Sequence, residues 1–371
     1  MDKDELRAWL RLSMTPGVGN EAARRLLACF ASPQLIFVQP ESDLRQVVSA
    51  EQAQALLVEP VELAVQHLRT QQWLAEQPDS CAIWTLDNLR YPRELMLLSD
   101  PPLMIYVQGQ LTGQLGHAVA IVGSRNPTPQ GLQTADQFGE ALSHAGLCVV
   151  SGLALGVDSA AHQGALRGGG TRTDAWQTVA VVGTGLDRVY PRQHQKLAKD
   201  IAKHGLLISE YMLGTPPLPQ NFPKRNRLIA TLGLGTLVVE AALKSGSLIT
   251  AKQALELGRE VLAIPGSIHA TQSHGCHALI RQGAKLVETA QDILEELQLT
   301  ATFPLFASSP IEIGASSHPL LVHMGYAPVS LDALQARCGL STADLQVQLM
   351  TLELEGAIGR LSGGLFQQLG R

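Results

Sequence analysis

The sequence has little charge, and positive charge does not predominate in it. Asp, Glu, Lys and Arg make up 16% of the 371 residues, and the formal net charge at pH 7 is -5. A chain with this balance has no overall positive field to attract nucleic acid or a membrane surface, so any anion site must be local. Hydrophobic residues reach 45%, as in folded proteins, and the length predicts two or three domains of about 100 to 200 residues each.

Paired cysteines and long apolar runs are also missing. The five cysteines are scattered singly, without the C-x-x-C pair of a zinc site, a redox motif or a disulfide framework: Cys29, Cys81, Cys148, Cys276 and Cys338. The first residues, MDKDELRAWL, lack the features of a signal peptide, and no apolar run reaches the ~18 residues of a membrane span. We therefore expect a soluble, cytoplasmic protein.

Signatures of catalysis and of common cofactors are absent as well. No dinucleotide fingerprint, Walker lysine, nucleophile elbow or Ser/His/Asp set can be assembled from the chain. Asp158 and His162 have the i, i+4 spacing of an acid/base or metal pair, but a helix-capping Asp and a half-buried His are more common. His269, His274 and His277 lie in a segment of loop composition that matches no standard zinc spacing. We expect no catalytic residue, no cofactor and no metal ion.

Residues 1–80 are predicted to form a helical domain of the SAM-like or helix-hairpin-helix kind. Apolar residues recur there at three- and four-residue spacing, as in amphipathic helices. The glycine hairpin TPGVGNEAA separates the first two helices, and Asn20 is placed to cap the second. In DNA-binding proteins such a hairpin offers backbone N–H groups to phosphates; a plain tight turn between packed helices is the alternative.

Residues 81–298 are predicted to form an α/β domain with an extended Rossmann-like, mainly parallel sheet. From about residue 117, short runs rich in Val, Ile and Leu alternate with helical stretches: HAVAIVGSR, GLCVVSGLA, TVAVVGTGL, GLLISEY, GTLVVEA, REVLAIPG and GAKLVE. Such runs are typical of strands buried on both faces, and in such sheets ligands bind beyond the carboxyl ends of the strands. The polar segment 167–177 is predicted to be an exposed loop.

The C-terminal residues 319–371 are predicted to form a winged helix, after a linker at 299–318 that is rich in Ser and Pro. Two helical stretches flank CGLS, and two short strands surround Gly363 and Gly364, which is the order of a helix-turn-helix followed by a wing. The helix that would read DNA, STADLQVQLMTLELEG, has no Lys or Arg. Protein contact is therefore favoured over duplex reading for this module.

Candidate binding residues gather in one basic segment and at the predicted strand ends. The segment NFPKRNRLIATLG, 221–233, holds Lys224, Arg225 and Arg227 between Phe222 and a buried run, and Arg125 follows a buried strand. Fixed cations beside an aromatic ring suit a single nucleic-acid strand, whose phosphates they contact and whose bases stack; a solvated surface cluster is the alternative. Small residues at strand ends would let a phosphate approach the backbone: Gly123, Ser124, Ser245 and Ser247.

From about residue 5 to the end, the chain resembles the DNA-processing protein A family (DprA, also called Smf). The resemblance is carried by YPRELMLLSDPPLMIYVQG, IVGSRNPTPQG, VVSGLALGVDSAAHQGAL, VAVVGTGLDRVYP, LISEY, FPKRNRLIATLG, VVEAALKSGSLITAKQALELGREVLAIPG and LIRQGA. It implies an extended Rossmann domain and a protein that binds single-stranded DNA. It also implies protection of incoming DNA during natural transformation and loading of the RecA recombinase on that DNA.

The same resemblance places the family's motifs on numbered residues. Its GSR and FPxRNR motifs fall on Gly123, Ser124, Arg125, Phe222, Pro223, Arg225, Asn226 and Arg227, with Lys224 at the variable position. The segment from Ser245 to Thr250 is expected to line the same pocket. The sequence departs from the family at His277, where the family usually has Asn, and in a polar insertion at 171–177. The departure at His277 leaves the details of the pocket open.

Two further expectations concern assembly and an alternative activity. Because a few nucleotides per pocket bind weakly, we expect a homodimer whose two pockets share one strand and gain avidity. The alternative function is a nucleotide or nucleoside-phosphate hydrolase of a related Rossmann-type fold. GLGTLVVEA, 233–241, resembles the GGxGTxxE motif of lysine-decarboxylase-like phosphoribohydrolases, although Leu234 breaks the glycine pair and Glu240 lies one residue too far along.

Overall fold

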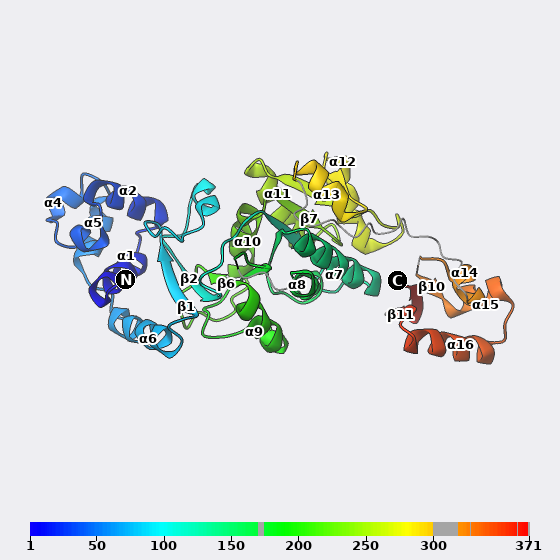
Figure 1. Ribbon diagram of the computed structural model, residues 1–371. Coiled ribbons are helices and arrows are strands. Elements are labelled where there is room, and N and C mark those ends of the chain that lie inside the picture. Colours follow the sequence, from blue (N-terminus) through cyan, green and yellow to red (C-terminus); the bar gives the residue numbers. More distant parts are fainter. Residues whose placement is uncertain (170–173, 300–317, 327, 362, 370–371) are drawn as a thin grey trace.

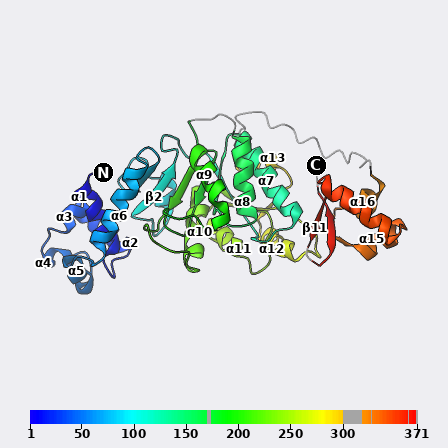
Figure 2. The same cartoon turned by 90° about the horizontal axis from the view of Figure 1, so that it is seen from below.

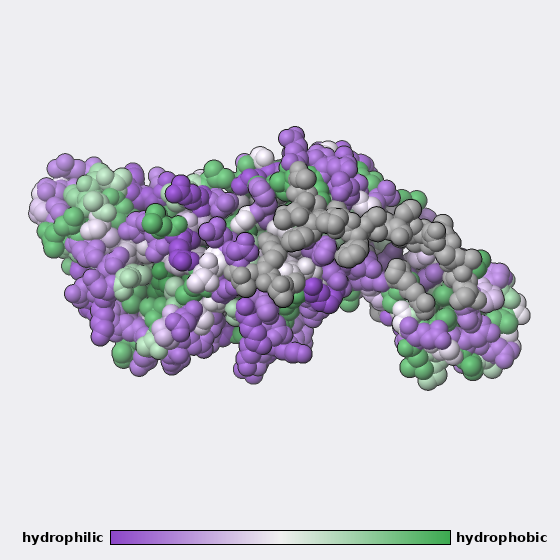
Figure 3. Space-filling view, viewed as in Figure 1, coloured by the Kyte–Doolittle hydropathy of each residue, from purple (hydrophilic) through white to green (hydrophobic). Residues whose placement is uncertain are grey.

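The computed structural model describes residues 1–169, 174–299, 318–326, 328–361 and 363–369. Helices come first along the chain, a large sheet covered by helices follows, and a small helical and stranded unit ends it (Figure 1). In the described part, no helix is long and apolar enough to cross a membrane. Figure 3 shows hydrophilic residues over much of one face, with hydrophobic areas over the N-terminal helices and the C-terminal unit.

The N-terminal part is helical, as predicted. Its helices are α1 (Lys3–Met14), α2 (Asn20–Phe30), α3 (Pro33–Ile36), α4 (Glu41–Leu44), α5 (Ala50–Leu57) and α6 (Leu63–Glu76). They pack around buried side chains that include Trp9, Leu12 and Leu26. The glycine hairpin lies between α1 and α2, but Asn20 does not cap α2: it is the first helical residue, and the cap is Gly19 without a side-chain hydrogen bond.

A nine-stranded sheet forms the centre of the molecule, in the order β1-β2-β6-β5-β4-β3-β7-β8-β9. Its strands are β1 (Cys81–Thr85), β2 (Met104–Gly109), β3 (Ala118–Val122), β4 (Cys148–Ser151), β5 (Thr178–Val181), β6 (Leu206–Ser209), β7 (Gly235–Val238), β8 (Glu260–Ala263) and β9 (Lys285–Leu286). The strands from β3 to β9 coincide with the apolar runs of the sequence and are parallel, which confirms the predicted fold class.

Two strands were not anticipated. β1 and β2 form an antiparallel pair, and β2 joins the sheet antiparallel to β6, with Tyr106 opposite Ser209 and Gly109 opposite Leu206. Their position depends on pairing with a strand about 100 residues later in the chain, which local periodicity cannot indicate. The sheet is therefore parallel from β6 to β9 and antiparallel at the β1 edge.

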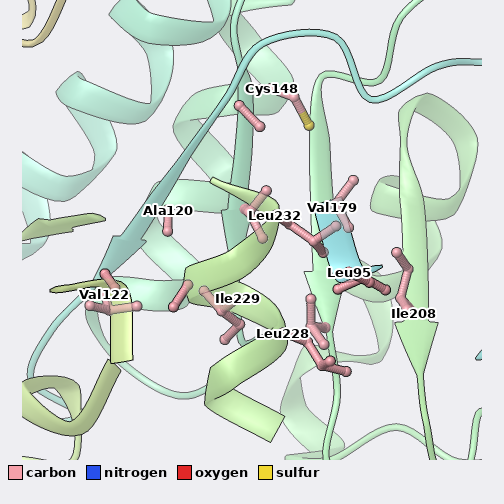
Figure 4. Close-up of a cluster of buried hydrophobic side chains, with 14 of the residues drawn as sticks. Leu95, Ala120, Val122, Cys148, Val179, Ile208, Leu228, Ile229 and Leu232 are labelled. Carbon is pink, nitrogen blue, oxygen red and sulfur yellow. The ribbon is translucent and has the colours of Figure 1, made fainter. Parts of the chain in front are cut away.

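Helices cover both faces of this sheet: α7 (Pro129–His144), α8 (Val157–Gly168), α9 (Gln195–His204), α10 (Asn221–Leu232), α11 (Ser247–Glu256), α12 (His274–Arg281) and α13 (Ala290–Glu296), with 3₁₀ turns η1 (Arg93–Leu97), η2 (Arg192–His194) and η3 (Thr271–Ser273). Alternate residues of β3 serve the two faces. Ala120 packs in a core with α10, α11 and α12, whereas Ile121 packs with α7, α8 and α13. Figure 4 shows Leu228, Ile229 and Leu232 of α10 beside strand residues.

The predicted exposed loop at 167–177 is wrong at both of its described ends. Residues 167 and 168 belong to α8. Trp176 is buried and stacks on Trp84, with ring centroids 6.1 Å apart, and its indole N–H donates to the carbonyl of Gln110 at 2.7 Å. A buried indole needs such a partner, and the polar composition of the segment conceals it. Residues 170–173 lie outside the described residues.

The C-terminal unit is a winged helix, as predicted, with α14 (Pro319–Met324), β10 (Val329–Ser330), α15 (Leu331–Cys338), α16 (Thr342–Leu354), β11 (Ile358–Leu361) and β12 (Leu365–Gln368). The helix pair and the strands β11 and β12 were expected, whereas α14 and β10 were not. The unit lies beside the start of α7, where Gln367 Nε2 donates to Gln130 Oε1 at 2.6 Å (Figures 1 and 2). Of the predicted linker, residues 300–317 lie outside the described residues.

Candidate nucleic-acid interface

A cavity of about 460 Å³ lies beyond the carboxyl ends of the central strands. Chain order from β3 leads to β4, β5 and β6 on one side of the sheet and, after α10, to β7, β8 and β9 on the other. The connections after β3 and β7 therefore diverge, which opens a crevice between these neighbouring strands. The lining includes Gly123, Ser124, Arg125, Asn126, Arg225, Asn226, Lys244, Ser245, Gly246 and Ser247.

The turn after β3 presents Arg125 to solvent. Ser124 is buried, and its Oγ accepts a hydrogen bond from the Asn126 N–H at 3.1 Å. Its carbonyl accepts from the Val157 N–H, also at 3.1 Å. Gly156 has φ +80°, and a Cβ there would collide with the Ser124 carbonyl, so only glycine permits this close approach. The Gly-Ser part of the motif thus fixes the backbone, and the Arg125 side chain remains exposed.

The serines at the start of α11 line the same cavity as Arg125, which confirms their predicted proximity. Ser245 Oγ lies 2.7 Å from Ser247 Oγ and accepts a hydrogen bond from the Ser247 N–H at 3.3 Å. Lys244 is exposed beside them and also lines the cavity. Sequence reasoning missed Lys244, although its position immediately before Ser245 at a strand-end segment was an available signal.

Arg225 lines the cavity but is held by the protein itself, contrary to the expectation that it is free for phosphate. It is 3% exposed, and its Nη1 donates to the carbonyls of Gly152, at 2.7 Å, and Val181. Burial lowers the pKa of Arg225 to about 10, which leaves the group charged at neutral pH. Burial raises the pKa of nearby Asp158, and the charge of Arg225 opposes that shift. Arg225 is therefore a structural cation beneath the cavity.

Arg227 is also neutralised internally, and it lies outside the cavity lining. Its Nη2 forms an ion pair with the Glu210 carboxylate, and its Nη1 donates to the Asp100 carbonyl at 2.9 Å. The two paired side chains are 14% and 5% exposed. Burial raises the pKa of Glu210, partly offset by Arg227 and Lys224. The expectation that Arg227 contacts phosphate thus does not fit its position.

The remaining residues of the basic segment lie in the first turns of α10. Lys224 is exposed, and Asn226, whose Oδ1 accepts from Arg225 Nε at 3.2 Å, lines the cavity. Phe222 is half-buried; its ring centroid lies 5.6 Å from that of Tyr190 and 5.5 Å from the guanidinium carbon of Arg125. An aromatic pair thus adjoins Arg125. Tyr190 was missed, since an isolated tyrosine before a proline gives no signal.

Three exposed cations are not ion-paired in the part of the chain that the structure describes. No ion pair among the described residues involves Arg125, Lys224 or Lys244. Arg125 and Lys244 line the cavity, and the rings of Phe222 and Tyr190 lie beside Arg125. Because the charges of the cations are not balanced within the fold, they can be balanced by an anionic ligand.

The residues considered for a metal or acid/base pair have structural partners. The Asp158 carboxylate accepts from the N–H groups of Gly152 and Ala154, at 3.1 and 3.3 Å. His162 is fully buried rather than half-buried, and its Nδ1 lies 2.7 Å from Thr178 Oγ1. Across the described ranges, no group of three or more His, Cys, Asp or Glu side chains is placed to hold a metal ion.

Glu240, the carboxylate of the alternative hydrolase motif, belongs to a second cavity of about 270 Å³ and not to the one that Arg125 lines. Its oxygens accept from the N–H of Thr128 at 2.9 Å and from Thr128 Oγ1 at 2.6 Å. A hydrolase would need its acid beside the phosphate-binding cation. Separate cavities give this alternative little support.

Comparison with known proteins identifies the family of this chain. The model of the family "DNA recombination-mediator protein A" matches residues 82–298, and that of the "DprA winged helix domain" matches residues 307–364. Protein Smf of Escherichia coli is 39% identical over 300 residues, which are 79% of this chain and 78% of the relative. DNA processing protein DprA of Streptococcus pneumoniae is 45% identical over 208 residues, covering 56% of this chain and 71% of the relative.

Two solved structures are similar in fold. That of DprA from Streptococcus pneumoniae aligns with a TM-score of 0.63 and 33% identity over 80% of this chain and 98% of its own. A structure of DNA processing protein A from Helicobacter pylori, described for its single-stranded DNA binding mode, aligns with a TM-score of 0.50 and 31% identity over 58% of this chain and 95% of its own. The chain belongs to the DNA recombination-mediator protein A family, DprA/Smf.

Proposed function

We propose that the protein binds single-stranded DNA across the cavity that Arg125 lines, beyond the carboxyl ends of β3 and β7. The observation that carries the proposal is that two exposed cations, Arg125 and Lys244, line that cavity without an ion-pair partner in the described parts of the chain. Lys224, in the first turn of α10, is a third exposed cation. The three cations are suited to contact phosphates, and the hydroxyl groups of Ser245 and Ser247 can add a hydrogen-bond donor. Such contacts read charge and not base identity, so binding is expected to have little sequence preference.

The aromatic pair beside Arg125 favours an unpaired strand. Phe222 and Tyr190 offer ring faces on which a base can stack, and only a base free of its complement can do so. Gly123 and Ser124 fix the turn after β3, and Arg225 supports the cavity from beneath. Asn226 and Ser247 donate hydrogen bonds to the DNA strand. The Helicobacter pylori relative, with its single-stranded DNA binding mode, supports this assignment.

The family assigns a DNA-processing role, and within it we propose a holder of DNA, not a catalyst. The protein protects incoming single-stranded DNA during natural transformation and loads RecA on it, in the cytoplasm. We further propose a homodimer whose two cavities share one strand, because a second linked contact raises affinity through effective concentration. Analytical ultracentrifugation that finds only monomers at working concentration contradicts the dimer.

The test compares single-stranded with duplex oligonucleotides by fluorescence anisotropy. Wild type is expected to prefer the single strand, and Arg125→Glu is expected to weaken that binding at least ten-fold because it replaces attraction by repulsion of phosphate. The matched control is Lys203→Glu on α9, which reverses an exposed cation paired with Asp200, away from the cavity. Equal affinity for single and double strands, or an Arg125→Glu variant that binds as wild type does, overturns the proposal.

An activity assay separates the proposal from the hydrolase alternative. Wild type is incubated with nucleoside monophosphates, and release of base or phosphate is followed. We expect no turnover above that of Glu240→Gln. Turnover that requires Glu240 would instead favour a hydrolase.

A further inference from the structure

The second cavity, between the winged helix and the central domain, has the features of a ligand site. Its lining comes from the start of α7, the ends of β7 and β8, the loop that follows β8, and the winged helix. The contact between the two units is tight, because a Cβ on Gly359 of β11 would lie 2.8 Å from the Pro129 side chain. At about 270 Å³, the cavity is far larger than the ~30 Å³ share of one water molecule.

Two residues that line this cavity, one from each unit, carry hydrogen-bond acceptors. Gln367 is 4% exposed, and its Oε1 has no hydrogen-bond partner among the described residues, although its Nε2 donates to Gln130 Oε1 and to the Tyr326 carbonyl. Glu240 contributes a carboxylate. A buried acceptor left unpaired is costly, so a ligand that donates a hydrogen bond would stabilise this arrangement.

The Glu240 carboxylate is held in place from one side. Thr128, the N-cap of α7, donates to both of its oxygens. Gly131, in the first turn of α7, leaves space for the Glu240 carboxyl group, because a Cβ on residue 131 would collide with that group. Each carboxylate oxygen retains a further acceptor site for a ligand.

Charge and shape narrow the class of ligand. Among the described residues that line the cavity there is no Lys or Arg, and the Glu240 carboxylate would repel a phosphate. The apolar lining is Val239, Ile264, Pro265, Ala270 and Pro328 with the ring of Tyr326. Acceptors beside flat apolar walls suit a planar ring with an exocyclic amino group. The site also adjoins the Arg125 cavity along the chain, since Asn126 and Gln272 line the Arg125 cavity while Thr128 and Ser273 line this one.

We infer that this interdomain cavity binds a nucleobase that carries an amino group, with Gln367 Oε1 and the Glu240 carboxylate accepting hydrogen bonds from it. The choice of a base rests on the proposed function, which places a DNA strand in the adjoining cavity. The base belongs either to that strand or to a free nucleoside. In both cases it contacts the central domain and the winged helix at once and favours their contact.

The test uses uncharged nucleosides, which avoid the phosphate contacts of the first site. Isothermal titration compares cytidine with uridine and adenosine with inosine, pairs in which an amino group is replaced by a carbonyl. With wild type, the amino member is expected to bind at least ten-fold more tightly. Gln367→Leu is expected to reduce this preference below three-fold, whereas Gln368→Leu, the neighbour on β12 that does not line the cavity, retains it.

Further variants separate this inference from a folding defect and from the proposed function. Glu240→Gln, which keeps the side-chain shape, is expected to lower the same preference. Arg125→Glu is expected to leave nucleoside preference intact while single-stranded DNA binding falls. Normal thermal unfolding and normal affinity for oligo(dT), whose base lacks an amino group, show that Gln367→Leu is folded. If Gln367→Leu is unfolded, the nucleoside preference of Glu240→Gln tests the inference instead.

Oligo(dC) and oligo(dT) distinguish the two sources of the base. A preference of wild type for oligo(dC) that Gln367→Leu loses identifies a base of the strand, and a preference confined to nucleosides identifies a free nucleoside. The inference is overturned if no nucleoside binds, if both members of each pair bind equally, or if Gln367→Leu and Glu240→Gln both keep the wild-type preference. Tighter binding of methylguanidinium than of any nucleoside also overturns it.

Discussion

Arg227 of α10 and Glu210, directly after β6, form an ion pair that the fold almost completely buries, with side chains 14% and 5% exposed. The pair joins a helix that covers the sheet to a strand end. The second oxygen of Glu210 has no hydrogen-bond partner among the described residues, so Arg227 is the main compensation for a buried carboxylate. A buried pair of this kind is expected to serve the fold and not the ligand.

Removal of one partner should destabilise the protein strongly. Arg227→Leu leaves Glu210 buried without its cation, and we expect the free energy of unfolding to fall by about 3 to 5 kcal/mol. Urea denaturation measures this change. The double variant Arg227→Leu with Glu210→Leu should recover part of the loss, because neither charge is then left uncompensated.

The same pair gives a check on the assignment of Arg227. Under conditions where the Arg227 variants are folded, their affinity for single-stranded DNA should lie within about three-fold of wild type. If the DNA affinity of a folded Arg227 variant falls as far as that of Arg125→Glu, Arg227 is part of the binding surface after all.

The free cations should determine how binding responds to salt. If three phosphates of a single strand are neutralised, log K should fall against log salt with a slope of about -2, since each phosphate contributes about -0.7. Lys244→Ala, like Arg125→Ala, should make the slope shallower by about 0.7, whereas the control Lys252→Ala, a cation of α11 paired with Glu256, should not. Anisotropy titrations at several salt concentrations give these slopes. An affinity independent of salt would exclude phosphate contacts as its source.

The sequence predicts the strands better than the side-chain directions. Strands buried on both faces are continuous apolar runs, so β3 to β9 were recognisable, whereas β1 and β2 depend on a distant partner. The basic segment looked like one cluster, but α10 already begins at Asn221. At 3.6 residues per turn, Lys224, Arg225 and Arg227 point in different directions: outward, beneath the cavity and toward Glu210. Which cation stays free depends on the phase of the helix against the sheet, which no local pattern sets.

The aromatic pair should contribute to binding through stacking. Tyr190→Ala is expected to weaken single-stranded DNA binding by about 1 kcal/mol or more, roughly five-fold at least, because base–aromatic stacking is worth about 1 to 3 kcal/mol per base. Tyr190→Phe keeps the ring and should bind as wild type does. Anisotropy at one salt concentration measures both, and the salt slope should not change, since no charge is removed. A loss in Tyr190→Phe as large as that in Tyr190→Ala would point to the hydroxyl instead.

His162 should make the protein less stable in acid. Burial lowers the pKa of His162 to about 3, with His194 and Arg225 nearby adding to the effect. Thr178 Oγ1 donates to the Val149 carbonyl at 2.6 Å, so the neutral ring donates from Nδ1 to that hydroxyl. Below the ordinary histidine pKa of about 6.5, the unfolded chain binds a proton that the folded protein excludes, and stability is lost as pH falls.

The expected size of this effect follows from the two pKa values. Between pH 7 and pH 5 the contribution of His162 should lower the free energy of unfolding by about 2 kcal/mol, because 1.5 pH units below 6.5 correspond to about 1.36 kcal/mol each. His162→Gln retains an N–H donor for Thr178 but cannot titrate, so its unfolding free energy should depend less steeply on pH by this amount. Asp158, whose pKa burial raises, titrates in both proteins and cancels in the comparison. Urea denaturation at pH 5, 6 and 7 measures the difference, and parallel pH profiles for the two proteins would show that His162 is not the group responsible.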